Sequence, residues 1–577
     1  MGRKWKYQPP TNEQMITANT LSAELDISPV LCNLLVNRGV TSVAEARNFF
    51  RPKLSALHNP FKMNDMDIAV QRLNKALGKK ERILVYGDYD VDGTTAVALV
   101  YKFLQQFSSN IDYYIPDRNE DGYGISKRGV DYAFSTGVKL VIVLDCGIKA
   151  IDEIAYAKSL GIDFIVCDHH VPDEEMPCAV AILNPKRPDS TYPYPHLSGC
   201  GVGFKFMQAF AMDNGIPADQ LYPLLDLVAV SIASDLVPIM GENRILAYHG
   251  IKQLNHSPST GLKAIINVCG LNEREVSIND IIFKIGPRIN ASGRVQKGKM
   301  AVDLLIENNL ETAMGMSLLI NEYNEVRKEL DKSMTEEANR IVAGLESFDE
   351  RRAIVIFNPD WHRGVIGIVA SRLTEVYHRP AVVITCTGDV ATGSARSVTG
   401  FDVYKAIENC RDVLDNFGGH TYAAGFSLKV ENIETFASRF EEFVTENILP
   451  EQVAPALEID AEIGFHQITR KFFSDLKKFA PHGPDNLKPL FCTRNVCDYG
   501  TSKVVGRRQE HIKLELIDDK SNIVFNGIAF GQSRQAKYIK SKQSFDICYT
   551  IEDNAYKHGE VQLQIESIHT KVTRDGK

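Results

Sequence analysis

Between Arg82 and about Pro238 the sequence alternates short runs rich in valine and isoleucine with stretches of helical periodicity. The runs include RILVYGD, KLVIVLDCG and DFIVCDHH, and helical stretches such as TAVALVYKFLQQF and IDEIAYAKSLG lie among them. Nearly continuous apolar strands separated by helices are typical of a parallel sheet that is buried on both faces. This pattern therefore predicts a doubly wound α/β domain.

Several apolar runs end in acidic or imidazole side chains. LVYGDYDVDG places three carboxylates at alternate positions, LVIVLD ends on an aspartate, FIVCDHH ends on an aspartate and two histidines, and LLDLVAVSIASDLVPI delivers a further aspartate. Ligands of an open parallel sheet bind beyond the carboxyl ends of its strands, so we expect these groups to meet at one edge. The residues concerned are Asp88, Asp90, Asp92, Asp145, Asp168, His169, His170 and Asp235.

One aspartate at a strand end is often only a helix cap or a turn residue. Many carboxylates together, however, raise each other's pKa and destabilise the fold unless cations neutralise them. The set is mostly oxygen, with one or two imidazoles and no thiolate, which favours Mn²⁺ or Mg²⁺ over a structural zinc. It is large enough for two ions that share a bridging group, an arrangement that clamps the attacking and leaving oxygens of a phosphoryl displacement.

Further segments follow this region. A long helix rich in charge and asparagine is expected after it, then a second α/β unit that begins at RAIVIFNPDWHRG, and finally short alternating strands typical of a small antiparallel barrel. We expect a helical extension over 1–80, a catalytic α/β domain over 81–310, a linking helix over 311–345, a smaller α/β domain over 346–450 and a barrel over 455–577.

Composition adds few constraints. The chain has 577 residues, 44% of them hydrophobic, and a formal charge of −8, so any binding of nucleic acid must depend on local patches. Its eleven cysteines form no C-x-x-C pair, which suits free thiols in a reducing compartment. No apolar run approaches the length of a membrane span. We therefore expect a soluble, cytoplasmic protein with no membrane partner.

The motifs GDYDVDG, LDCGI and CDHH, with the later Asp235, resemble the four motifs of the DHH phosphoesterase superfamily. IPDRNEDGYG, LSGCGVGFK and FKIGPRINASGR narrow the resemblance to the RecJ family of bacterial single-stranded-DNA exonucleases. WHRGVIGIVASRL, GSARS and NFGGHTYAAGF resemble the accessory domain of that family, called DHHA1. The resemblance implies a DHH domain, a DHHA1 domain and a C-terminal barrel of the OB type.

The resemblance also implies roles for individual residues. It gives Asp90, Asp92, Asp145, His169 and Asp235 as metal ligands, with Asp145 as the bridging and catalytic carboxylate. His170 would then face the substrate phosphate. Other DHH phosphoesterases have a histidine where this chain has Tyr86, so either Asp88 takes the place of that histidine or one metal is held by one protein ligand fewer.

The expected nucleic-acid contacts lie further along the chain. Guanidinium groups match phosphate oxygens, so GPRINASGR offers Arg288, Asn290 and Arg294 as phosphate contacts, and we count Arg294 among the catalytic residues. The alternative is a glycine turn whose arginines pair with nearby acids. In the second unit the resemblance implies DNA contacts by the residues Ser394, Arg396, Gly419 and His420.

The C-terminal region has its own charge pattern. From Phe491 to Lys577 there are 14 Lys and Arg against 11 Asp and Glu, a net charge of +3 within a chain of −8. Basic residues, among them Arg507 and Arg508, cluster in KVVGRR and RQAKYIKSK, with aromatic residues interleaved. OB-folds hold single strands on such a basic groove with aromatic platforms. The alternative is a solvated basic face.

The resulting hypothesis is a metal-dependent exonuclease that degrades single-stranded DNA from the 5′ end to nucleotides, in recombination and repair. The strand type and polarity come from the resemblance. The chain has no G-x-x-x-x-G-K-[ST] loop, so a helicase would have to supply single strands, and a single-strand-binding protein is a further expected partner. The alternatives are a phosphodiesterase for short oligonucleotides or cyclic dinucleotides, a pyrophosphatase, and an inactive DNA-binding scaffold.

Overall fold

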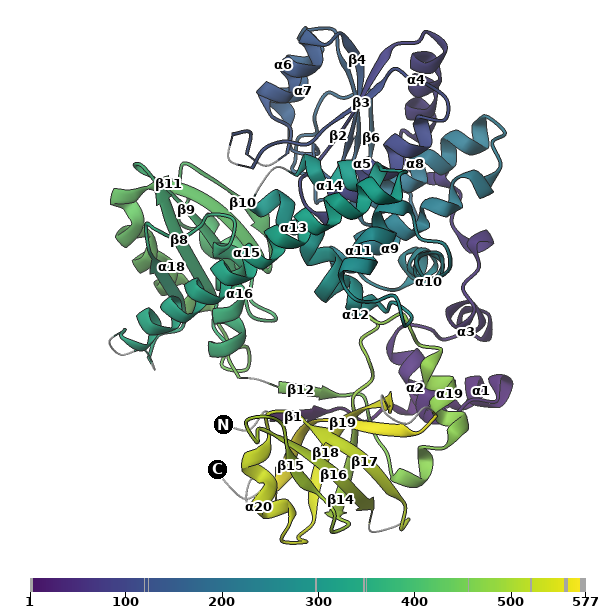
Figure 1. Ribbon diagram of the computed structural model, residues 1–577, viewed down its shortest axis with the longest axis vertical. Coiled ribbons are helices and arrows are strands. Elements are labelled where there is room, and N and C mark those ends of the chain that lie inside the picture. The colour runs from purple at the N-terminus through teal and green to yellow at the C-terminus, as the bar shows by residue number, and fades with distance from the viewer. Residues whose placement is uncertain are drawn as a thin grey trace. The chain divides into compact units, whose positions relative to one another are not determined.

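The computed structural model describes residues 4–118, 120–122, 124–295, 298–345, 348, 350–454, 456–518, 521–554 and 559–570. These residues form two compact units (Figure 1). One unit combines Met1–Lys53 with Ala454–Lys577, and the other is Leu54–Val453. The first segment of the chain therefore folds with the C-terminal region and not with the residues that follow it.

A five-stranded sheet in the larger unit has the order β3-β2-β4-β5-β6, and all neighbouring strands are parallel. Its strands are β2 (Arg82–Gly87), β3 (Ile111–Tyr114), β4 (Val138–Leu144), β5 (Asp163–Cys167) and β6 (Ala181–Leu183). The chain passes from β2 to β3 on one side and returns to β4 on the other. This reversal of direction between β2 and β4 is where doubly wound sheets bind their ligands.

Helices cover both faces of this sheet. One core cluster joins Val85 and Ile142 to α4 (Met66–Gly78), α5 (Val91–Leu104) and α8 (Gly199–Asp213). A second cluster joins the alternate strand residues to α6 (Lys127–Ser135) and α7 (Ile151–Ser159). Because successive strand residues are buried on opposite faces, the strands have the near-continuous apolar sequence that predicted this fold. The prediction of a doubly wound parallel sheet is confirmed.

The core continues into a group of helices. They are α9 (Leu225–Ser234), α10 (Gly241–His256), α11 (Thr260–Val268), α12 (Ile278–Asp280), the π-helix η5 (Ile281–Ile285), α13 (Gly286–Val295), α14 (Lys299–Ile306) and α15 (Leu310–Ala343). The first half of α15 buries Ala313 and Ile320 in the core of the parallel-sheet domain. Its second half buries Met334 and Ala338 against the next domain. The long linking helix is therefore confirmed (Figure 1).

The second α/β domain has a mixed sheet of order β10-β11-β9-β8-β7, in which only β7 and β8 are parallel neighbours. Its strands are β7 (Ile354–Phe357), β8 (Ala381–Thr387), β9 (Val390–Arg396), β10 (Asn416–His420) and β11 (Ala423–Lys429). α16 (Ile366–Tyr377) packs with α15 on one face, and α17 (Val403–Glu408) and α18 (Ile433–Asn447) cover the other.

The smaller unit contains a closed barrel. Its strands follow the order β14-β18-β19-β17-β16, and a pairing between β14 and β16 closes the ring. The strands are β14 (Phe491–Asp498), β16 (His511–Asp518), β17 (Val524–Ala529), β18 (Phe545–Asp553) and β19 (Val561–Thr570). β13 (Ala461–Glu462), β15 (Lys503–Val505), α19 (Arg470–Lys477) and α20 (Ala536–Ile539) complete it. The predicted OB-type barrel is confirmed. Its strands are not all antiparallel as the sequence pattern predicts, because β17 and β19 pair in parallel.

The N-terminal segment of the chain packs on this barrel. It forms β1 (Lys4–Tyr7), α1 (Asn12–Leu25), α2 (Pro29–Asn37) and α3 (Val43–Phe50), and β1 pairs in parallel with β12 (Ala456–Ile459). The Trp5 ring stacks on His569 with centroids 3.8 Å apart, and its Nε1 donates a hydrogen bond to Ser567 Oγ at 3.0 Å. These contacts place the N-terminal strand on β19.

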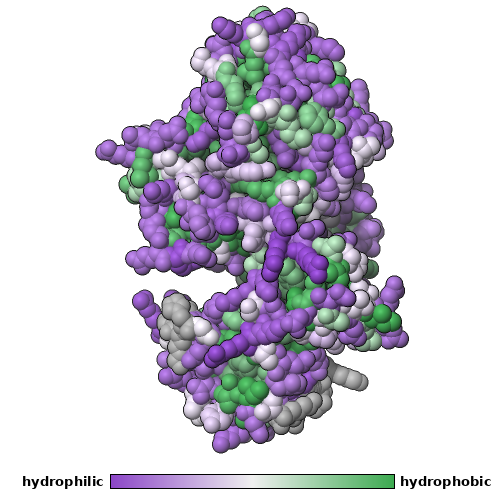
Figure 2. All heavy atoms as spheres, turned by 90° about the vertical axis from the view of Figure 1, so that its right-hand side faces the viewer, coloured by the Kyte–Doolittle hydropathy of each residue, from purple (hydrophilic) through white to green (hydrophobic). Residues whose placement is uncertain are grey.

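Within the described ranges, no helix combines the length and apolarity needed to cross a membrane. On the face that Figure 2 shows, hydrophilic residues predominate and hydrophobic side chains form scattered patches.

Candidate metal centre

The expected acidic and imidazole residues do meet at the carboxyl edge of the parallel sheet. Asp88 directly follows β2, Asp145 directly follows β4, and Asp168 opens the turn after β5, so three neighbouring strands deliver them. Asp90 caps α5 by accepting a hydrogen bond from Gly93 N at 3.0 Å. Asp92 in the first turn of α5, and Asp235 directly after α9, complete the set.

The donor atoms fall into overlapping groups that could each hold a cation. In one group Asp88, Asp90 and Asp145 offer oxygens within 4.8 Å of one another. In a second group Asp92, His169 and Asp235 do the same, and a third joins Asp145 with the two histidines. His169 Nε2 lies 3.2 Å from Asp145 Oδ1 and 3.6 Å from Asp235 Oδ2, so the groups are contiguous.

The protonation of His169 follows from its surroundings. Its Nδ1 lies 3.0 Å from the carbonyl oxygen of Leu197, and because a carbonyl can only accept, Nδ1 carries the hydrogen. Burial lowers the pKa of His169 to about 3, so the ring is neutral and Nε2 presents a bare lone pair. That lone pair faces carboxylate oxygens, an arrangement of acceptors against acceptors that a cation would resolve.

The carboxylates show the same deficit of positive charge. Burial, followed by the charge of Asp90, raises the pKa of Asp88 to about 8 and that of Asp92 to about 6. Burial and neighbouring aspartates raise the pKa of Asp145 well above its ordinary value. Among the described residues no hydrogen-bond donor reaches Oδ1 of Asp88 or Oδ1 of Asp145, although both atoms are buried. These oxygen-rich, under-satisfied donors fit Mn²⁺ or Mg²⁺.

The start of α8 holds two members of the site. Gly199 N donates to Asp92 Oδ2 and Cys200 N donates to Asp92 Oδ1, each at 2.7 Å. A Cβ on Gly199 would lie 2.5 Å from Asp145 Oδ1, so only glycine allows the helix to approach this closely. In the sequence this segment stands out only as a family motif. The serine before a glycine-rich helix start was the available signal, since serine is a common N-cap.

His170 connects the two α/β domains. Its Nδ1 lies 2.7 Å from Asp168 Oδ1. Burial alone would lower the pKa of His170, but the charge and hydrogen bond of Asp168 outweigh it and raise the pKa to about 9, so the ring is cationic near neutrality. The ring stacks on His420 of β10, with centroids 5.2 Å apart and planes at 12°. The pKa of His420 is lowered to about 4 by burial and then by the charge of His170.

A guanidinium cluster lies between the same domains. Arg294 Nη1 donates to the carbonyl oxygen of Gly364 at 3.0 Å. Burial lowers the pKa of Arg294 to about 9, and the charges of Arg118, Arg396 and Arg327 act in the same direction. Within the described residues Arg118, Arg294 and Arg396 form no ion pair with a carboxylate. Such a cluster attracts an anion. Two of its arginines, Arg118 and Arg327, were not predicted from the sequence.

Other expected contacts are placed as follows. Ser394 Oγ accepts a hydrogen bond from Arg396 Nη1 at 3.0 Å, and both residues lie on β9. Arg288 is fixed on α13, where its Nε donates to Asn321 Oδ1 and its Nη1 donates to the carbonyl oxygen of Lys284, both at 2.9 Å. Asn290 is half-buried on the same helix. Gly419 lies in β10 with φ 150°, where a Cβ would meet the backbone of β11.

The hydroxyl of Tyr86 bonds to backbone groups. It donates to the carbonyl oxygen of Gly124 at 3.0 Å and accepts from Ser126 N at 3.2 Å. Asp88, in contrast, belongs to a group of potential ligands. Asp88 therefore lies where it could take the place of the missing histidine.

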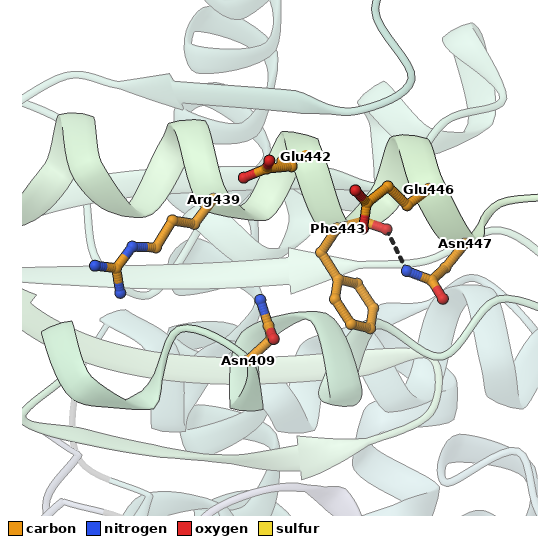
Figure 3. Close-up of a pocket in the computed structure, with 6 residues that line it drawn as sticks. All are labelled: Asn409, Arg439, Glu442, Phe443, Glu446 and Asn447. Atoms are coloured by element: carbon orange, nitrogen blue, oxygen red, sulfur yellow. Dashed lines mark hydrogen bonds between the residues drawn. The ribbon is translucent and has the colours of Figure 1, made fainter.

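A separate hollow lies beside α18 and the end of α17 (Figure 3). Its lining residues are Asn409, Arg439, Glu442, Phe443, Glu446 and Asn447. Arg439 Nη1 already pairs with Asp412, and no lining residue belongs to the carboxylate or guanidinium groups. This hollow is therefore not the candidate site.

The doubly wound sheet, with aspartates and histidines at its carboxyl edge and a second α/β domain closing over them, defines a protein of the DHH class. Family models agree with this class: "DHH family, N-terminal domain" matches 82–232, "DHHA1 domain" matches 350–446 and "RecJ OB domain" matches 459–567. The chain is 33% identical over 565 residues to the single-stranded-DNA-specific exonuclease RecJ of Salmonella typhimurium, covering 94% of this chain and 96% of that protein. The chain belongs to the RecJ family.

Two further relatives show how far the similarity extends. The RecJ exonuclease of Bacillus subtilis is 35% identical over 536 residues, which are 92% of this chain and 66% of that longer protein, just under two thirds. The crystal structure of Thermus thermophilus RecJ in complex with Mn²⁺ superposes with a TM-score of 0.83 at 24% identity. The superposition covers 98% of this chain and 79% of the Thermus thermophilus chain, and it shows that the two proteins share a fold.

Proposed function

We propose that this chain is a metal-dependent exonuclease that degrades single-stranded DNA in the 5′–3′ direction to nucleotides, in DNA recombination and repair. The observation that carries the proposal is the pair of ligand groups joined through Asp145 and His169, with the guanidinium cluster between the same two domains. Relatives named as single-stranded-DNA-specific exonucleases support the choice of substrate.

The donor set would hold two ions, Mn²⁺ or Mg²⁺. Asp88 and Asp90 would hold one, His169 and the carboxylates Asp92 and Asp235 the other, and Asp145 would contact both. When bound, such ions polarise the scissile phosphate and lower the pKa of a water molecule. The neutral His169, with Nε2 free, has the protonation that a metal ligand needs.

The remaining residues would bind and orient the DNA. The cationic His170, held by Asp168, would donate to an oxygen of the reacting phosphate. Arg294 and Arg396, with the Ser394 hydroxyl, would hold a neighbouring phosphate, because desolvated guanidinium groups repelling one another gain most from an anion. Arg288, Asn290, Gly419 and His420 are proposed to line the path of the strand.

The barrel is proposed to add affinity. Arg507 and Arg508 are both exposed in the turn between β15 and β16, where they are free to reach phosphates. A helicase and a single-strand-binding protein are proposed partners, since the sequence has no phosphate-binding loop for ATP-driven unwinding. We place the protein in the cytoplasm, where its cysteines, all present as free thiols, stay reduced.

The test is digestion of end-labelled DNA with Mn²⁺, Mg²⁺ or EDTA. A 5′-labelled single strand should release labelled mononucleotide at the earliest times, a blunt duplex should stay nearly intact, and EDTA should stop the reaction. Shortening from the 3′ end first would contradict the polarity. Cleavage confined to very short oligonucleotides or cyclic dinucleotides would favour a small-substrate phosphodiesterase, and binding without cleavage would favour an inactive scaffold.

A further inference from the structure

A chain of hydrogen bonds through two serine hydroxyls ends on one of the carboxylates of the site. Gly201 N lies 3.1 Å from Ser198 Oγ, and Ser198 Oγ lies 2.6 Å from Ser231 Oγ. Ser231 Oγ in turn lies 2.7 Å from Asp92 Oδ1. Both serines are fully buried, one at the start of α8 and the other on α9. This series of hydrogen bonds therefore connects α5, α8 and α9 without an intervening water molecule.

The direction of each bond follows from the two ends. A backbone amide can only donate and a carboxylate can only accept, so Ser198 donates to Ser231 and Ser231 donates to Asp92. Together with the amides of Gly199 and Cys200, Asp92 then accepts three hydrogen bonds, each at 2.7 Å. Three donors stabilise the charged form of the carboxylate and fix its plane.

The same serine also contacts the next member of the donor group. The carbonyl oxygen of Ser231 accepts a hydrogen bond from Asp235 N at 2.9 Å. Leu197, which precedes Ser198, accepts from His169 Nδ1. The serine pair and its neighbours therefore fix Asp92, His169 and Asp235, the three residues of one donor group. Oδ1 of Asp88, in the other group, has no donor among the described residues.

We propose that Ser231, supported by Ser198, is a positioning residue that sets the affinity of one of the two ion positions, the one formed by Asp92, His169 and Asp235. This inference rests on the two-ion site of the proposed function. Ser231 acts through the orientation and charge of Asp92, to which its hydroxyl donates. Loss of such an outer partner costs about 10-fold to 100-fold in metal affinity.

The experiment is a titration of the metal-free full chain with Mn²⁺, without DNA. Binding is monitored by calorimetry and by the electron-spin resonance signal of free Mn²⁺. The unaltered protein should bind two ions. Ser231→Ala should weaken one by about 10-fold to 100-fold and leave the other unchanged. Ser198→Ala should weaken the same ion by a smaller factor, because Asp92 keeps its direct donor. Ser317→Ala, at a buried serine of α15 whose hydroxyl donates to Met314 O, is the matched control and should change neither.

Ion affinities that stay unchanged, or that weaken equally at both positions, overturn the inference. If Ser231→Ala folds and binds both ions as before, or if it weakens both equally, Ser231 does not position one ion. If Ser231→Ala does not fold, unchanged affinities in Ser198→Ala lead to the same conclusion, since the Ser198 hydroxyl supports Ser231. An unaltered protein that binds two ions but leaves single-stranded DNA intact would refute the proposed function alone, and one that binds no Mn²⁺ would refute both.

Discussion

His169 Nε2 lies 3.2 Å from Asp145 Oδ1, and this contact joins the two donor groups of the site. We predict that Asp145→Ala abolishes DNA cleavage, because removal of the shared carboxylate separates the two cation positions. Binding of single-stranded DNA should be largely retained, since the proposed DNA contacts lie elsewhere. Asp412→Ala, at an exposed carboxylate paired with Arg439, is the control and should cleave normally. Near-normal cleavage by folded Asp145→Ala would refute the two-ion assignment.

The metal-free protein should lose stability as the pH rises from about 7 to about 9. The pKa of Asp88 is raised to about 8 by burial and Asp90, and that of His170 to about 9, chiefly through Asp168 against the effect of burial. Both groups bind protons more tightly in the folded than in the unfolded chain, so the stability that each contributes is lost as the pH passes its folded pKa.

The measurement is the melting temperature in EDTA across this range. It should fall as the pH rises, and added Mn²⁺ should raise it more at the alkaline end, because the metal replaces the protons held by the carboxylates. Asp88→Asn should flatten part of the slope. A melting temperature in EDTA that does not change with pH would show that these groups are not held as described.

The sequence predicted the positions of Asp88, Asp145 and His169 because each follows an apolar strand, and neighbouring parallel strands end at one edge. It did not predict Ser231, which reaches Asp92 across 139 positions through the packing of α9 on α5. In the sequence, Ser231 is a single serine within an apolar helix, and nothing around it indicates which residue its hydroxyl contacts. What such a residue touches depends on helix packing, which hydrophobic periodicity alone does not specify.

The same limit applies to the ends of the chain. Trp5 pairs with Ser567 across 562 positions, so a linear division into domains could not assign the first strand to the barrel. Arg118 and Arg327 join Arg294 from different elements. Arg118 stands in the motif IPDRNEDGYG, but the sequence does not show that either arginine approaches Arg294. Arg118 follows β3, Arg294 lies on α13 and Arg327 lies on α15, so their proximity depends on how these elements pack.

Replacement of His170 by glutamine should lower kcat by about 100-fold to 1,000-fold with little change in KM or in Mn²⁺ affinity. The reason is that His170→Gln removes the cation that we propose contacts the reacting phosphate, while the predicted ligands stay in place. Asp168→Asn should lower kcat in the same direction, because the carboxylate that keeps His170 protonated is lost. If His170→Gln cleaves with an unchanged single-turnover rate constant, His170 takes no part in the catalytic step.

Sulfate should raise the melting temperature of the protein, because an anion relieves the repulsion among Arg118, Arg294 and Arg396. Arg396→Ala should reduce this stabilisation and weaken the binding of short single-stranded oligonucleotides by about tenfold or more. The control is Arg439→Ala, an arginine on α18 whose guanidinium pairs with Asp412. Equal responses to sulfate in both variants would argue against an anion site in the cluster.

The double variant Arg507→Ala with Arg508→Ala tests the barrel. Both side chains are exposed, so their removal should leave the fold and the cleavage of very short oligonucleotides unchanged. Binding of long single strands should weaken, and the slope of log K against log salt should become shallower by about 0.7 for each lost phosphate contact.

The control is the double variant Lys477→Ala with Lys488→Ala, which removes the same charge from the same unit. These lysines pair with Asp553 and Glu552, so the slope should change less. If the arginine variant keeps both the affinity and the salt slope of the unaltered protein, Arg507 and Arg508 belong to a solvated face and take no part in DNA binding.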